Sequence, residues 1–125
     1  MPSLSALRGV SFVGKDLEIN SNAVLTSLSG LEGLSSVQCI EINSNGSLTS
    51  LSGLEGISSV QCIEINSNGK LTSLSGLEGL SSVRSSLYVV DNPRLTSLSA
   101  LHSLASVGGT LLIEDNDALT SLSGL

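Results

Sequence analysis

The stretch Leu48–Lys70, LTSLSGLEGISSVQCIEINSNGK, repeats the stretch that precedes it in the chain. Residues 25–47 differ from it at only two positions, Leu34 against Ile57 and Ser47 against Lys70. The tetrapeptide LTSL opens every unit and starts at Leu25, Leu48, Leu71, Leu95 and Leu119, so the spacings are 23, 23, 24 and 24 residues. A repeat of this length predicts a solenoid in which each unit forms one coil stacked on the next.

Each unit contains two hydrophobic periods. The first half has period three, with apolar residues at Leu48, Leu51, Leu54, Ile57 and Val60. This spacing does not fit an amphipathic α-helix and predicts turns with short strand or 3₁₀ pieces. The second half has period two, which predicts a short β-strand with alternating inward and outward side chains. The expected strands are residues 17–20, 40–43, 63–66, 87–90 and 111–114.

An asparagine follows each expected strand at a fixed distance, at Asn22, Asn45, Asn68, Asn92 and Asn116. The LxIxxN pattern, with LxxLxxL before it, resembles the leucine-rich repeat family, most closely its receptor-L-domain-like members. The resemblance covers the whole chain. It implies a mainly β fold, a right-handed parallel β-solenoid of leucine-rich-repeat type with about five coils of 23–24 residues. We expect one such domain over residues 1–125, uncapped at both ends, as in a fragment or a small protein without caps.

The composition restricts both the core and the partners. Hydrophobic residues make up 40% of the 125 residues, but there is one Phe, one Tyr and no Trp. The core must therefore consist of thin layers of Leu, Ile and Val. The formal charge of −6 and the scattered basic residues argue against nucleic acid and anionic membranes as partners. No apolar run approaches the roughly 20 residues of a membrane-spanning helix, and no pattern fixes the cellular compartment.

In a stacked solenoid, equivalent positions form columns along its side. We interpret the asparagine column as structural, because an amide can donate to and accept from the backbone of a turn. Asn45-Gly46-Ser47 also forms a glycosylation sequon, which is accidental if Asn45 points inward. A second column, Glu32, Glu55 and Glu78, has two interpretations: a solvated acidic face or a site for a divalent cation. The first is favoured, and no cofactor or metal is predicted.

Cys39 and Cys62 occupy equivalent positions in adjacent 23-residue units, which places them within disulfide range. Parallel neighbours in register do not guarantee suitable Cβ directions, so we favour a pair of packed free thiols. The only histidine, His102, lies about two coils from Cys62 in another column, so it is not placed to activate that thiol. Nucleotide-binding and hydrolase motifs are absent from the sequence, and we predict a protein without catalytic residues.

The strand-bearing face is the predicted site for a protein or glycan ligand. Its outward residues are Glu18, Glu41, Glu64, Tyr88, Val90, Leu112 and Glu114. An alternative is a surface-active or structural array, ice-binding or adhesive, that uses two columns of hydroxyl side chains. The threonine column resembles the ice-binding faces of some antifreeze proteins and consists of Thr26, Thr49, Thr72, Thr96 and Thr120. The serine column beside it consists of Ser27, Ser50, Ser73, Ser97 and Ser121. We also expect self-association into a homo-oligomer, because open solenoid ends expose unpaired strand edges.

Overall fold

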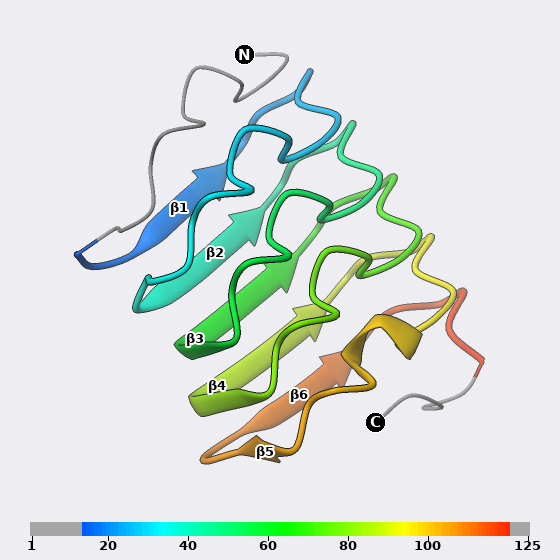
Figure 1. Ribbon diagram of the computed structural model, residues 1–125. Coiled ribbons are helices and arrows are strands. Elements are labelled where there is room, and N and C mark those ends of the chain that lie inside the picture. The colour runs from blue at the N-terminus through cyan, green and yellow to red at the C-terminus, as the bar shows by residue number, and fades with distance from the viewer. Residues whose placement is uncertain (1–13, 121–125) are drawn as a thin grey trace.

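Parallel strands stacked side by side form one wall of a β-solenoid in the computed structural model, which describes residues 14–120 (Figure 1). The strands are β1 (Leu17–Asn20), β2 (Cys39–Asn43), β3 (Ser59–Asn66), β4 (Ser82–Val90), β5 (Ser106–Val107) and β6 (Leu111–Glu114). A single turn of 3₁₀ helix, η2 (Ser99–Leu101), lies between β4 and β5. The mainly β fold predicted from the repeat is confirmed.

The strands pair in chain order, and equivalent residues of successive repeats face each other. Leu17 pairs with Ile40, which pairs with Ile63, and then with Leu87 and Leu111. Both β5 and β6 pair with β4, because they are two pieces of the same last coil. The four steps from β1 to β6 give four turns of the solenoid. The rest of the predicted array, in residues 1–13 and 121–125, lies outside the described residues.

The inward positions of both hydrophobic periods form one continuous core. The fully covered side chains include Leu25, Leu28, Leu31, Leu34, Ile40 and Ile42, together with their equivalents in the next two coils. Leu111 continues the inward column of Ile40, Ile63 and Leu87, but it is 45% exposed. Within residues 14–120 no further strand lies beyond β6, so the side of Leu111 that faces away from β4 is open.

β3 and β4 begin earlier than the sequence predicted. Their pairing already starts at Ser59 with Ser82 and Val60 with Val83. These residues precede the predicted strands 63–66 and 87–90 and are separated from them by a corner of the coil. After that corner Cys62 pairs with Ser86, so Arg84 and Ser85 together stand opposite the single residue Gln61. This is a β-bulge, in which one extra residue redirects side chains on the bulged strand. It is the place where the repeat changes from 23 to 24 residues.

The turn after each strand uses a left-handed backbone conformation. Five non-glycine residues have a positive φ there, between 55° and 59°: Ser21, Ser44, Ser67, Asp91 and Asp115. Serine in this region is uncommon and costs free energy. In every described coil this residue comes directly before the asparagine of the repeat, so the left-handed turn sets the direction in which that asparagine points.

Candidate functional site

The predicted strand face consists of two columns of outward side chains. In the first column Glu18 pairs in register with Glu41, then with Glu64, Tyr88 and Leu112. The second column runs Asn20, Asn43, Asn66, Val90 and Glu114. Glu18, Asn20, Leu112 and Glu114 are exposed, and the others of the strand face are partly exposed. The face is therefore acidic and amide-rich over β1–β3 and more apolar over β4 and β6.

Two polar atoms on this face have no partner. The Oδ1 atoms of Asn43 and Asn66 are covered and accept no hydrogen bond from the described residues. In β1 the equivalent atom of Asn20 does accept one, from the Asn43 backbone N–H at 3.2 Å. Two members of this second column, Val90 and Glu114, belong to the face predicted from the sequence, but the covered Oδ1 atoms were not foreseen.

Like charges meet at the edge of the strand face. A hydrogen bond to the Glu41 carboxyl group, and next the negative charge of Glu41, raise the pKa of Glu18 above its ordinary value of 4.5. The folded chain therefore binds more protons than the unfolded chain just above that pH. The free energy of unfolding should fall as the pH rises through this window.

We expect an NMR titration to give a midpoint for Glu18 above 4.5. Glu41→Gln should move that midpoint down toward the ordinary value, because the neighbouring negative charge is removed. Asp117→Asn, an exposed change outside this column, is the matched control and should leave the midpoint in place. An unchanged midpoint in Glu41→Gln would contradict the coupling.

The asparagine column forms a continuous hydrogen-bonded ladder inside the solenoid, which we call the Asn ladder. Asn45 donates from its Nδ2 atom to the Ile19 carbonyl at 2.8 Å and to the Asn68 Oδ1 atom at 3.2 Å. Its backbone N–H also donates to that Oδ1 atom, at 3.1 Å. Asn68 and Asn92 make the same set of contacts one coil further on. Asn45 is 0% exposed, so its sequon does not present an accessible side chain for glycosylation.

The second acidic column has a structural contact that neither interpretation of the sequence foresaw. Glu32, Glu55 and Glu78 each accept a hydrogen bond from the backbone N–H of the glycine two residues earlier, at 2.7 Å. Each carboxylate thus closes a turn of its own coil. Within residues 14–120 no group of three His, Cys, Asp or Glu residues is arranged to hold a metal ion.

The threonine column lies on an exposed side of the turns. The Oγ1 atoms of Thr49, Thr72 and Thr96 each donate to the backbone carbonyl of the threonine in the preceding coil, at 3.2–3.4 Å. The backbone N–H of the same residues bonds to the same carbonyl. The threonine hydroxyls therefore reinforce the stacking of the coils as well as facing solvent.

The preference for free thiols was wrong. Cys39 and Cys62 form a disulfide between paired residues of β2 and β3, with their Cα atoms 4.6 Å apart. The short corners Gln38-Cys39 and Gln61-Cys62 bring the two Cβ atoms within bonding reach. Sequence reasoning had the spacing right but could not supply the side-chain directions at a corner.

Reducing this disulfide should destabilise the chain. The bond closes a loop with a sequence separation of 23 residues, and a loop of this size is worth about 3 kcal/mol in restricted unfolded-state entropy. Urea denaturation with and without reductant measures the difference. The double variant Cys39→Ser/Cys62→Ser should have the same urea midpoint as the reduced protein, and adding reductant should not change that midpoint. An unchanged midpoint on reduction would contradict the prediction.

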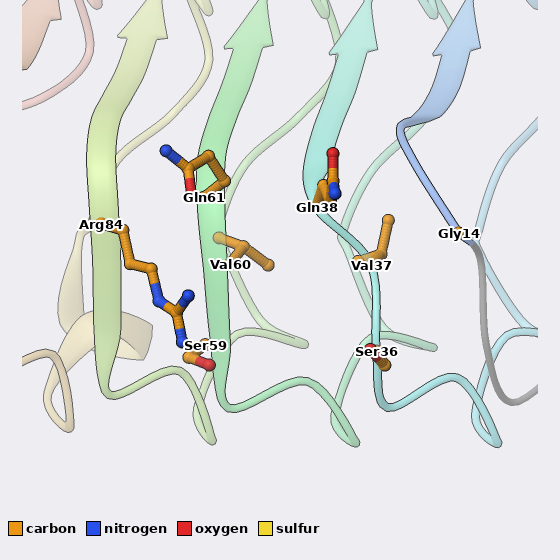
Figure 2. A pocket seen from close by; sticks show the side chains of 8 residues that line it. All are labelled: Gly14, Ser36, Val37, Gln38, Ser59, Val60, Gln61 and Arg84. Carbon is orange, nitrogen blue, oxygen red and sulfur yellow. The ribbon is translucent and has the colours of Figure 1, made fainter.

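A polar groove crosses the coils at the residues that precede the strand segments 40–43, 63–66 and 87–90. We call it the entry groove. It has a volume of about 380 Å³ and is lined by Gly14, Ser36, Val37, Gln38, Ser59, Val60, Gln61 and Arg84 (Figure 2). Sequence reasoning missed it, although one signal was present. The residue after the inward valine is glutamine in two successive units and arginine in the third.

The chain matches no protein-family model, no curated protein and no solved structure. Among the described residues no helix has the length and apolar character needed to cross a membrane.

Proposed function

We propose that this chain is a non-catalytic binding scaffold of leucine-rich-repeat type, a right-handed solenoid that engages a protein partner through its strand face. One observation carries the proposal: the outward residues of successive repeats lie in register on a paired sheet. A sheet of this kind holds side chains at fixed positions, so little conformational entropy is lost when a partner binds. The Cys39–Cys62 disulfide favours an oxidising compartment for this encounter.

The strand face suggests the chemistry of the partner. Tyr88, Val90 and Leu112 lie on adjacent strands, and Leu112 is 37% exposed, which suits the apolar centre of an interface. The glutamates of β1–β3 lie to one side of this centre. A partner with an apolar side chain flanked by Lys or Arg would complement both parts, and its charge would relieve the repulsion between Glu18 and Glu41.

The test uses partners captured by the whole chain and then purified. We expect Tyr88→Ala to weaken binding of a purified partner at least ten-fold, because large central side chains dominate interface energies. Thr72→Ser, an exposed change on the threonine column, is the matched control and should leave the affinity unchanged. The proposal fails if every purified partner binds Tyr88→Ala, Leu112→Ser and the unaltered chain equally well.

We also propose that copies of the chain associate through the edge of β6. Within residues 14–120 this strand pairs only with β4, and Leu111 beside the free edge is 45% exposed. An unpaired edge with an apolar side chain favours pairing with another chain. Sedimentation velocity should show concentration-dependent association that Leu111→Lys reduces. A monomer at all concentrations would rule this association out.

The threonine column supports a second candidate function, a surface-active array. Its side chains are exposed and are held in line by backbone pairing between coils. Thermal hysteresis of the purified chain decides this candidate. Freezing-point depression that Thr49→Val and Thr72→Val alter would favour it, and no hysteresis would eliminate it.

A further inference from the structure

We propose that the entry groove binds an acidic saccharide with a single terminal carboxylate, whose neutral sugar units lie over Gln38 and Gln61 and whose carboxylate is held by Arg84. This site is separate from the strand face and does not depend on the function proposed for that face. It crosses three consecutive coils, and adjacent coils are 4.6 Å apart at the neighbouring disulfide.

The polar side chains of the entry groove make no polar contacts with one another or with the rest of the described fold. Within residues 14–120 the Arg84 guanidinium makes no ion pair, and the amides of Gln38 and Gln61 make no side-chain hydrogen bond. The bulge at Arg84 and Ser85 directs this strand differently from its neighbours. Figure 2 shows the Arg84 side chain extending toward Ser59 and the Gln61 amide leaning toward β4. The groove thus presents several unused donors and acceptors on one surface.

The polar side chains of the entry groove match the hydrogen-bonding groups of a saccharide. Glutamine and serine side chains both donate and accept hydrogen bonds, as sugar hydroxyls do. Val37 and Val60 also line the groove but are buried in the core, so its accessible surface is mainly polar. An extended peptide fits less well, because β2 and β3 are paired on both sides and offer no free edge for strand addition.

The charges around the entry groove favour a ligand with one carboxylate, held by Arg84. A guanidinium binds a carboxylate through two parallel hydrogen bonds. One outward position beyond the disulfide, the strand carries Glu41 in the coil of Gln38 and Glu64 in the coil of Gln61, but Tyr88 in the coil of Arg84. One carboxylate is therefore accommodated at Arg84, and further carboxylates along the groove would meet negative charge.

The test titrates the whole chain with sialyllactose, which carries one terminal carboxylate on a neutral disaccharide, and follows backbone amide shifts by NMR. We expect saturable shifts concentrated at groove residues and at least ten-fold weaker binding of lactose and of trigalacturonate. Arg84→Gln, which places the residue of the two preceding coils here, should reduce the affinity for sialyllactose at least ten-fold. Arg94→Gln, an exposed change outside the groove, should leave it unchanged.

Three results would overturn the proposal: no saturable shifts with sialyllactose, equal affinity of Arg84→Gln and the unaltered chain, or shifts that lie outside the groove. Full competition by sodium acetate at the same concentration would also overturn it, because it would show a simple anion site. Tyr88→Ala should bind sialyllactose normally, so failure of this site and failure of the strand-face proposal are distinguishable.

Discussion

Asn68→Ala should cost about 5 kcal/mol of folding free energy, because it interrupts the Asn ladder at its centre. The Asn68 Nδ2 atom donates to the Ile42 carbonyl at 2.9 Å, and its Oδ1 atom accepts from the Asn45 backbone N–H at 3.1 Å. Alanine removes the acceptor of the buried Asn45 N–H and a donor to the Ile42 carbonyl, and it also removes the amide contact to Asn45. Each orphaned buried group costs about 1–3 kcal/mol. Urea denaturation measures the total.

Two further variants separate hydrogen bonding from volume. Asn66→Ala, two residues earlier, removes a partly exposed amide whose Oδ1 atom has no partner, and it should change stability by less than about 0.5 kcal/mol. Asn68→Asp keeps the shape but loses the Nδ2 donor and buries a charge, so it should be unstable at neutral pH and recover partly in acid. Equal costs for Asn66→Ala and Asn68→Ala would contradict the ladder as a source of stability.

The stacking of the coils could be predicted from the sequence because it depends on spacing alone. Once units of 23–24 residues place leucines at equal intervals, burying them requires equivalent positions to lie over one another. The register of Glu18, Glu41, Glu64, Tyr88 and Leu112 follows from the same rule. The structural role of the asparagine column was predicted too, but the inward position of Asn45 was left open until its amide was found beside the carbonyl of Ile19.

The corner geometry could not be predicted, because it depends on local backbone directions. The bond between Cys39 and Cys62 requires their Cβ atoms to converge, and spacing does not determine that. The bulge at Arg84, where β4 has one residue more than β3, was equally invisible in the spacing of the apolar residues. The carboxylate of Glu55 was assigned to solvent because the turn that aims the Gly53 N–H at it was not visible in the sequence.

Gly53→Ala should cost about 4 kcal/mol. Gly53 has φ of 122°, a conformation that L side chains rarely adopt, and a Cβ atom there would overlap the backbone carbonyl of Leu28 in the preceding coil. Strained dihedrals of this kind cost about 1–3 kcal/mol of folding free energy. The overlap with the backbone of the preceding coil adds to this cost, because neither coil can move away without opening the packed core. Gly46→Ala is the matched control and should be nearly neutral, because a Cβ atom there meets nothing within 4 Å.

The chain itself contains an alternative to this glycine turn. The equivalent of Gly53 in the last described coil is Ala100, and there the backbone forms η2 while His102 stands where the three preceding coils have glutamate. Alanine is thus accommodated by a 3₁₀ turn that does not use the carboxylate contact. We expect Gly53→Ala/Glu55→His to be more stable than the sum of the two single changes by about 1 kcal/mol, since the pair allows that turn to form. Strictly additive costs would mean that the carboxylate contact and the glycine conformation are independent features of the turn.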